Sequence, residues 1–80
     1  MEISEYFNLE DILKLNLPND IKEEIKETFG KKVFYEENDS CKMGVLIGIA
    51  THGRLNGVYY ITNVNNNKNY VPIWKSITKV

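Results

Sequence analysis

Residues 42–64 read KMGVLIGIATHGRLNGVYYITNV, and this stretch decides the fold. β-branched and aromatic residues dominate on both sides of Asn56-Gly57, and such residues favour extended strands. The Asn-Gly pair tolerates the positive backbone φ that a two-residue hairpin turn requires. The stretch therefore predicts two antiparallel strands, over residues 42–51 and 58–64, joined by a tight turn at Asn56-Gly57.

Both faces of the longer predicted strand carry apolar residues. Side chains along a strand alternate between the two faces of a sheet. Alternation assigns one face to Val45, Ile47 and Ile49 and the other face to Leu46, Gly48 and Ala50. We therefore expect both faces to be at least partly covered, with Gly48 at a bend in the sheet.

The chain before Gly30 has a helical pattern. Asn8 can cap a helix that begins at Leu9, and Pro18 ends that pattern. A second helix is expected from Asp20, with Glu23 completing a capping box. Its apolar residues recur every fourth position, and Gly30 follows where a left-handed C-cap belongs. The first third of the chain is thus predicted to form two short helices.

Three more short strands are expected, over residues 33–36, 69–73 and 77–80, with turns at 37–41 and at Asn65-Asn66-Asn67 and one helical turn over 72–76. Five short strands with a helical turn before the last are similar to the SH3-like small β-barrels. The resemblance is carried by Asn56-Gly57 and by Tyr70-Val71-Pro72-Ile73-Trp74-Lys75-Ser76-Ile77. It covers residues 31–80 and is closer to Tudor-like and KOW-like barrels than to signalling SH3 domains, whose paired tryptophans are absent here.

The expected fold class is therefore α+β, with two short N-terminal helices followed by a five-stranded antiparallel SH3-like barrel. We expect a single domain over residues 1–80, with a helical segment over 1–30 and a small β-barrel over 31–80. The alternative arrangement is an open four-stranded antiparallel sheet packed against the helices. The resemblance implies binding of nucleic acid, proteins or modified side chains, and it does not choose among them.

Charge is divided unevenly along the chain. All eleven acidic residues lie between Glu2 and Asp39, and with five lysines they give residues 1–39 a formal charge of −6. Residues 40–80 carry five cations and no acid, a formal charge of +5. The sum is the net charge of −1. Such a dipolar distribution bears on partners and on steering rather than on fold.

Several function classes are not favoured by the sequence. One cysteine cannot form an internal disulfide, and the acidic N-terminus lacks the pattern of a secretory signal, so a cytoplasmic location is expected. No metal-ligand spacing, phosphate-binding loop or catalytic motif is present, so no metal, no cofactor and no enzymatic activity are expected. The weakest hypothesis is a small oligomeric enzyme with His52 as base, or a Cys41–His52 pair.

The leading hypothesis is a small binding module with a basic, aromatic barrel face. Cations meet phosphates and rings stack on bases where small barrels hold single-stranded nucleic acid. The anionic partner would be nucleic acid or a nucleotide. The residues expected to bind it are Lys42, Arg54, Tyr59, Lys68, Tyr70, Trp74 and Lys75.

The alternative hypothesis is a protein–protein interaction module. A chain of this size and composition would suit a small inhibitor or adaptor, including one encoded by a phage or mobile element. The acidic helix would then make the contact, through Glu23, Glu24 and Glu27. A homo-oligomer, in which the acidic half of one copy meets the basic half of another, is a further possibility.

Overall fold

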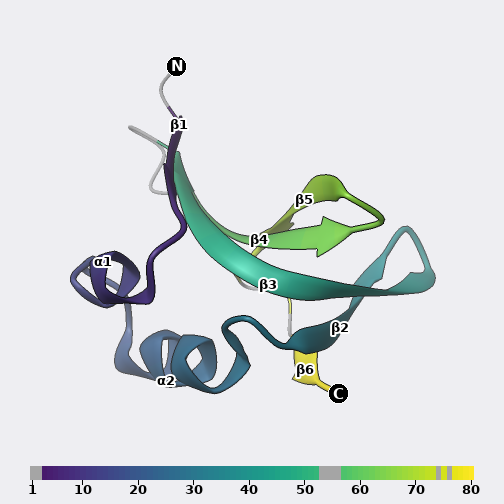
Figure 1. Ribbon diagram of the computed structural model, residues 1–80, viewed down its shortest axis with the longest axis horizontal. Helices are drawn as coiled ribbons and strands as arrows, with labels where there is room; N and C mark the ends of the chain where they lie inside the picture. The colour runs from purple at the N-terminus through teal and green to yellow at the C-terminus, as the bar shows by residue number, and fades with distance from the viewer. Residues whose placement is uncertain (1–2, 53–56, 74, 76) are drawn as a thin grey trace.

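A computed structural model describes residues 3–52, 57–73, 75 and 77–80 (Figure 1). Within these residues the chain forms two helices and six strands, with 56% of the residues in strands and 21% in helices. In chain order the elements are β1 (Ile3–Tyr6), α1 (Leu9–Leu13), α2 (Asn19–Thr28), β2 (Lys32–Glu37), β3 (Ser40–His52), β4 (Gly57–Val64), β5 (Asn67–Pro72) and β6 (Thr78–Lys79).

The long strand β3 organises an open antiparallel sheet. β4 pairs with the second half of β3 and β5 pairs with β4, so one path through the sheet runs β5-β4-β3-β2-β6. The other edge of β3 is shared, because β2 pairs with its first half and β1 with its second half. β3 therefore has neighbours along most of its length on both edges, as its apolar composition requires.

The expected fold class, α+β with a closed five-stranded barrel, is wrong, because the described residues are mostly β and form one open sheet. The described strands form an open sheet of six, because β6 is only two residues long and pairs with β2 rather than with β5. The sheet also contains β1, a short and partly polar strand that the sequence analysis left unassigned. The sheet is open, as in the alternative arrangement, but it has six strands instead of four.

The strict alternation expected along β3 is also wrong. Leu46 pairs with Thr62 while Gly48 pairs with Ile61, so Ile47 is an extra residue in a β-bulge. The bulge shifts the alternation by one residue. Leu46 and Ile49 therefore share one face of the sheet, and both are fully buried. The distortion next to Gly48 is where a bend was expected.

Local turn and cap chemistry agrees with the sequence at several points. The Asn8 side chain accepts a hydrogen bond of 2.8 Å from the Glu10 backbone N–H, which confirms the predicted N-cap of α1. Gly30 has the expected positive φ, at 77°, but it does not cap α2: the C-cap residue is Phe29, and the Gly30 N–H donates to the Leu46 carbonyl at 2.8 Å. The β4–β5 hairpin turns at Asn65 and Asn66, whose φ values of 52° and 66° are positive.

One predicted helix cap and two predicted turns are not confirmed. α2 begins at Asn19, and its N-cap residue Pro18 makes no side-chain capping bond, so the capping box expected at Asp20 does not form. The helical turn expected over residues 72–76 falls partly on residues outside the described part of the chain. The two-residue turn expected at Asn56-Gly57 is wrong, because Gly57 is already the first residue of β4. β3 and β4 are nevertheless antiparallel, with His52 opposite Gly57.

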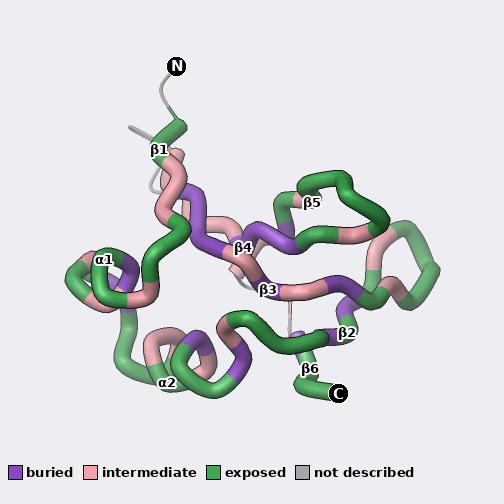
Figure 2. Tube along the Cα trace, in the orientation of Figure 1, coloured by how far each residue is buried: buried purple, intermediate pink, exposed green. Residues whose placement is uncertain are grey.

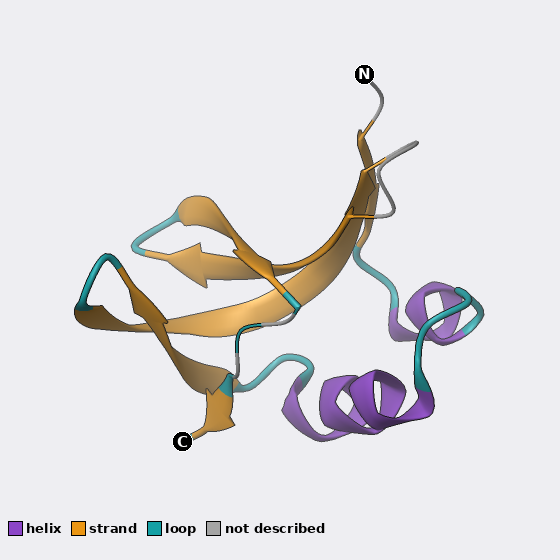
Figure 3. Ribbon diagram, turned by 180° about the vertical axis from the view of Figure 1, so that it is seen from behind, coloured by secondary structure: helices purple, strands orange, loops and turns teal. Residues whose placement is uncertain are grey.

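Both helices pack on one face of the sheet, which we call the inner face (Figures 1 and 3). Buried side chains of the sheet and of the helices form a single core there: Ile12, Leu17, Ile25, Val33, Tyr35, Leu46, Ile49, Tyr60, Val71 and Ile77. Figure 2 shows that burial follows the middle of β3 and β4. Neither helix in the described residues has the length and apolar character needed to cross a bilayer.

A buried hydrogen-bond network joins β2 to β4 and β5 on the inner face. The Tyr35 hydroxyl lies 3.0 Å from the Thr62 hydroxyl and accepts a hydrogen bond of 3.1 Å from the Asn69 amide. Tyr35 and Thr62 are both buried, so the network satisfies polar groups that would otherwise lack partners. These hydrogen bonds link β2, near one edge of the open sheet, to β4 and β5, which lie towards the other edge.

Candidate functional site

The opposite face of the sheet, which we call the outer face, carries most of the exposed apolar surface. Residues directly opposite each other in an antiparallel pair project from the same face. The register therefore assigns to the outer face Ile3, Glu5, Lys32, Phe34, Glu36, Met43, Val45, Gly48, Ala50, Tyr59, Ile61, Asn63, Lys68 and Tyr70. The Phe7 ring also lies there, because a Cβ on Gly48 would come within 2.9 Å of it.

Exposure is concentrated on this one face. Six large apolar side chains are exposed among the described residues, and five of them are on the outer face. These five are Ile3 (59% exposed), Phe7 (49%), Phe34 (38%), Met43 (47%) and Tyr70 (44%). The sixth is Val80 near the C-terminus. The inner face exposes no comparable side chain in the described strands, because the helices cover it.

Two groups of side chains form the outer face. The first lies on β2 and β3, where Phe34 is directly opposite Met43 and next to Lys32 and Glu36 along β2. The second joins β1 to β5, where Glu5, Phe7, Lys68 and Tyr70 meet above β3 and β4. A row of cross-strand partners, Lys32, Val45, Asn63 and Lys68, runs between the two groups.

The group between β1 and β5 is held by one carboxylate. Glu5 Oε1 lies 3.3 Å from Lys68 Nζ, and the Tyr70 hydroxyl donates a hydrogen bond to Glu5 Oε2. The Lys68 ammonium also lies 5.7 Å from the centre of the Phe7 ring, within the range of a cation–π contact. These long side chains can reach across two strands because β3 has only Gly48 and Ala50 beneath them.

These contacts shift the pKa values of all three polar groups. The hydrogen bond from Tyr70, together with the Lys68 ammonium, lowers the pKa of the Glu5 carboxyl below its ordinary value of 4.5. The same carboxylate raises the pKa of the Tyr70 hydroxyl and of the Lys68 ammonium. Glu5 is thus ionised at neutral pH and offsets the charge of Lys68.

Tyr70 also lines a small apolar pocket on the outer face. The pocket has a volume of about 200 Å³ and is lined by Ile3, Ala50, His52, Tyr59 and Tyr70. Tyr59 and Tyr70, two of the predicted site residues, therefore meet at one cavity. With Phe7 and Lys68 they form the part of the outer face that most resembles the predicted aromatic platform.

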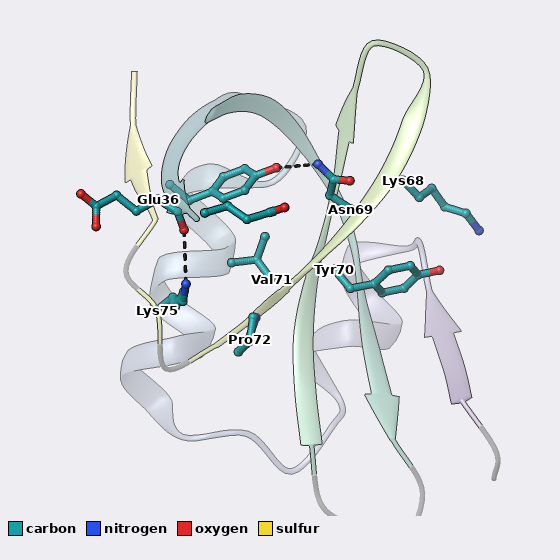
Figure 4. A pocket seen from close by; sticks show the side chains of 9 residues that line it. Glu36, Lys68, Asn69, Tyr70, Val71, Pro72 and Lys75 are labelled. Carbon is teal, nitrogen blue, oxygen red and sulfur yellow. Dashed lines mark hydrogen bonds between the residues drawn. The ribbon is translucent and has the colours of Figure 1, made fainter. Parts of the chain in front are cut away.

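A second pocket, of about 300 Å³, lies between β2 and β5 (Figure 4). The Lys75 ammonium donates a hydrogen bond of 3.5 Å to the Glu36 backbone carbonyl at its border. Figure 4 shows the Glu36 carboxylate pointing away from this pocket, and Lys68 and Tyr70 extending from the far side of β5. Lys68, Tyr70 and Lys75, which are three of the predicted site residues, nevertheless all line this pocket.

The described residues bring together part of the predicted basic, aromatic site, since Lys68, Tyr70 and Lys75 line one pocket and Tyr59 and Tyr70 line another. Tyr59, Lys68 and Tyr70 share the outer face. Lys42 is opposite Tyr35 on the inner face and pairs with Glu37 at 3.3 Å. Arg54 and Trp74 lie outside the residues that the structure describes. Two of the predicted cations, Lys42 and Lys68, are thus each matched by a carboxylate from the acidic half of the chain.

The three acidic residues proposed on α2 differ in their surroundings. Glu23 is exposed and forms an ion pair of 3.2 Å with Lys26, and Glu27 is also exposed. Glu24 is half-buried, and its charge adds to burial in raising the pKa of Tyr60 to about 12. The helix therefore presents two of the three carboxylates to solvent.

The residues considered for catalysis are far apart. Cys41 and His52 lie at opposite ends of the same strand, β3, so they cannot form a nucleophile–base pair within one chain. No group of three metal-ligating side chains occurs in the described ranges. Phe7, Lys32, Phe34 and Met43 are site residues that the sequence analysis missed.

No protein-family model, no curated protein and no solved structure matches the chain. The candidate site is therefore defined by its own geometry.

Proposed function

We propose that this protein is a non-catalytic binding module that binds a partner protein through the outer face of its sheet. The observation that carries the proposal is the placement of five of the six exposed large apolar side chains of the described residues on that face. Exposed apolar patches rimmed by polar residues mark interaction surfaces. Aromatic residues and Met are enriched in protein interfaces, and Phe34, Met43, Phe7 and Tyr70 are of these types.

The charges of the outer face also favour a protein over a polyanion. Lys32 and Lys68 on this face are balanced by Glu5 and Glu36. A neutral, mixed rim around an apolar centre suits a protein surface, whereas affinity for nucleic acid depends on unmatched positive charge. In this role the chain would act as a small adaptor or inhibitor. The exposed, free Cys41 agrees with the reducing cytoplasm as its location.

The test is affinity capture from an extract of the source cells with tagged wild-type protein and two variants. Met43→Lys places a charge in the apolar centre of the outer face, and because Met43 is already exposed the variant is expected to fold. It should lose the captured partner. The control Glu23→Gln with Glu27→Gln changes the exposed face of α2 and should retain it. Loss of the partner in the α2 variant alone would move the binding site to the helix.

A second candidate function is binding of single-stranded nucleic acid or a nucleotide at the group between β1 and β5. The observation in its favour is the contact of the Lys68 ammonium with the Phe7 ring, beside the exposed Tyr70 ring. Rings can stack on bases while a lysine meets phosphate. In this case Glu5 competes with the phosphate for Lys68.

Fluorescence anisotropy with labelled single-stranded DNA and RNA at low salt tests this candidate. Glu5→Gln should strengthen binding because it releases Lys68, and Lys68→Ala should weaken it. Equal binding, or no binding, by both variants and the wild type would remove this candidate.

A further inference from the structure

The first group of the outer face has a pattern that is complementary to itself. Lys32, Phe34 and Glu36 are alternate residues of β2, so all three project from the outer face. All three are exposed. A cation and an anion thus lie at equal spacing, two residues or about 7 Å, on either side of an aromatic ring. We propose that the protein bound at this part of the outer face is a second copy of the same chain, related by a two-fold axis that passes through Phe34.

The two-fold axis brings opposite charges together. The axis lies in the plane between the two sheets and runs perpendicular to β2 at the level of Phe34. A rotation of 180° about this axis exchanges the positions of Lys32 and Glu36 along the strand direction. Lys32 of each copy then faces Glu36 of the other copy, and the two Phe34 rings meet at the centre. In a parallel arrangement the same residues would place like charges opposite each other. The pattern therefore favours one orientation and disfavours the other.

Neither of these charged side chains forms an ion pair with another residue that the structure describes. The ion pairs among the described residues join Lys26 to Glu23, Lys42 to Glu37 and Lys68 to Glu5, and they include neither Lys32 nor Glu36. The Glu36 backbone carbonyl accepts a bond from Lys75, while Figure 4 shows its carboxylate pointing outward. Both side chains are thus available for a contact between copies.

The apolar centre and the total surface fit a dimer. Phe34 is flanked across the strands by Met43 on β3 and Thr78 on β6. The chain exposes 5504 Å², whereas a folded monomer of 9.3 kDa is expected to expose about 5,000 Å². Removal of this excess of about 500 Å² from each copy would bury about 1,000 Å² in total, which is about the least that a specific interface is expected to bury.

This inference rests on the proposed function, since it names the partner of the same face. It is tested by sedimentation velocity over a range from about 1 µM to 1 mM. The proteins are the wild type, Lys32→Glu, Glu36→Lys, and an equimolar mixture of these two variants. The control Glu27→Lys makes the same change of net charge as Glu36→Lys, at an exposed position on α2.

The wild type and the Glu27→Lys control are expected to form a dimer with similar Kd. Each charge reversal replaces two attractive contacts by two repulsive ones, so the dimer Kd of either variant alone should rise by about tenfold or more. In the mixture, the Lys32→Glu chain carries carboxylates at both positions and the Glu36→Lys chain carries ammonium groups at both, so each contact again joins opposite charges. The mixture should therefore recover a heterodimer with a Kd close to that of the wild type.

A wild type that stays monomeric throughout this range overturns the inference. A dimer that responds equally to all three charge reversals, or a mixture that does not recover association, overturns the two-fold arrangement through Phe34. The proposed function fails by a different result. If the chain is monomeric but captures another protein that Met43→Lys releases, the outer face remains a binding site and only the identity of the occupant is wrong.

Discussion

The two faces of the sheet are built from the same strands but are covered differently. The inner face carries Leu46, Ile49 and Tyr60, which are buried under α1 and α2 together with the other core residues. The outer face carries Phe34, Met43 and Tyr70 in solvent. Alternate residues of the same strands therefore differ in exposure: one set belongs to the core, and the other set includes the exposed apolar residues that we propose bind a partner.

The difference shows how an 80-residue chain can keep a buried core and still leave apolar side chains exposed on one face of its sheet. A chain of this size buries only about 60–65% of its unfolded surface, so few apolar residues can be left uncovered without a loss of stability. Here the two short helices cover one face only. Ala50 and Ile61 of the outer face are buried as well, but the exposed apolar residues of that face add little to folding. A change at one of them should therefore affect the binding of a partner more than the stability of the fold.

The largest expected effect separates the two faces directly. Leu46→Ala removes a fully buried side chain from the inner face and should lower the free energy of unfolding by about 2–5 kcal/mol. Met43→Ala, on the same strand but on the outer face and 47% exposed, should lower it by less than about 1 kcal/mol. Urea unfolding followed by circular dichroism measures both. Similar losses for the two variants would mean that the faces do not differ as described.

The second prediction concerns the end of β1, where the chain comes close to Gly48 of β3. A Cβ on Gly48 would meet the backbone carbonyl of Tyr6 and come within 2.9 Å of the Phe7 ring. Gly48→Ala should therefore destabilise the protein by about 1–3 kcal/mol. In the control, Gly57→Ala, the new Cβ lies 3.2 Å from the Tyr59 ring, which can move more easily than backbone. Thermal unfolding of both variants should show the larger shift for Gly48→Ala, and equal shifts would contradict this account of β1.

The third prediction uses a tyrosine of the inner face. Burial first, and then the charges of Glu24 and Asp20, raise the pKa of Tyr60 to about 12 from 10.0. Because the unfolded chain ionises first, the stabilising contribution of Tyr60 is complete below pH 10 and is lost as the pH rises towards 12. At pH 11 the loss should be about 1 kcal/mol relative to neutral pH.

Tyr60→Phe removes this contribution, so the difference in unfolding free energy between wild type and variant should change between pH 9 and pH 11. A constant difference over that range would show that Tyr60 does not titrate abnormally. Ultraviolet absorbance of the folded protein gives an independent measure of the same pKa.

The smallest effect is expected on the outer face, at Glu5. Its pKa is lowered by Tyr70 and Lys68, so its stabilising contribution is present above pH 4.5 and is lost as the pH falls through the lowered folded value. Glu5→Gln should cause a small loss of stability at pH 7, since the group is partly exposed to solvent. The loss should disappear in more acidic solution. A loss that is independent of pH would mean that the carboxylate charge is not the cause.

Local features of the fold were predictable from the sequence because their causes are local. Asn8 caps α1 through its own side chain, and Gly30 and the Asn65-Asn66 turn adopt the positive φ that their residue types favour. The antiparallel pairing of β3 with β4 follows from two adjacent apolar runs. These features need no information from distant parts of the chain.

The remaining features depend on distant contacts. The bulge at Ile47 is set by how β3 pairs with β4, and an alternating pattern cannot reveal one extra residue. β1 is four residues long and pairs with a segment more than forty residues away, from Tyr6–Ile49 to Ile3–His52. Closure of the sheet into a barrel likewise depends on pairing between its two terminal strands, β5 and β6, and the sequence of a single strand does not reveal it.

The candidate site was predictable in part for the same reason. Tyr59, Lys68 and Tyr70 lie on adjacent strands and do share a face. The ion pair of Lys68 with Glu5 could not be predicted, because it requires β1 to lie next to β3. The alternation of Lys32, Phe34 and Glu36 is visible in the sequence. That these three side chains are exposed could not be predicted, because their exposure depends on which face of the sheet the helices cover.

The measurement that tests the central claim most directly is site-specific photo-crosslinking in the source cells. A benzoyl-phenylalanine in place of Phe34 would report on the outer face, and the same residue in place of Glu27 would report on the exposed side of α2. The account predicts a discrete protein adduct from position 34, at the mass of a dimer if the occupant is a second copy, and none from position 27. No discrete adduct from position 34, or the same adduct from both positions, would contradict it.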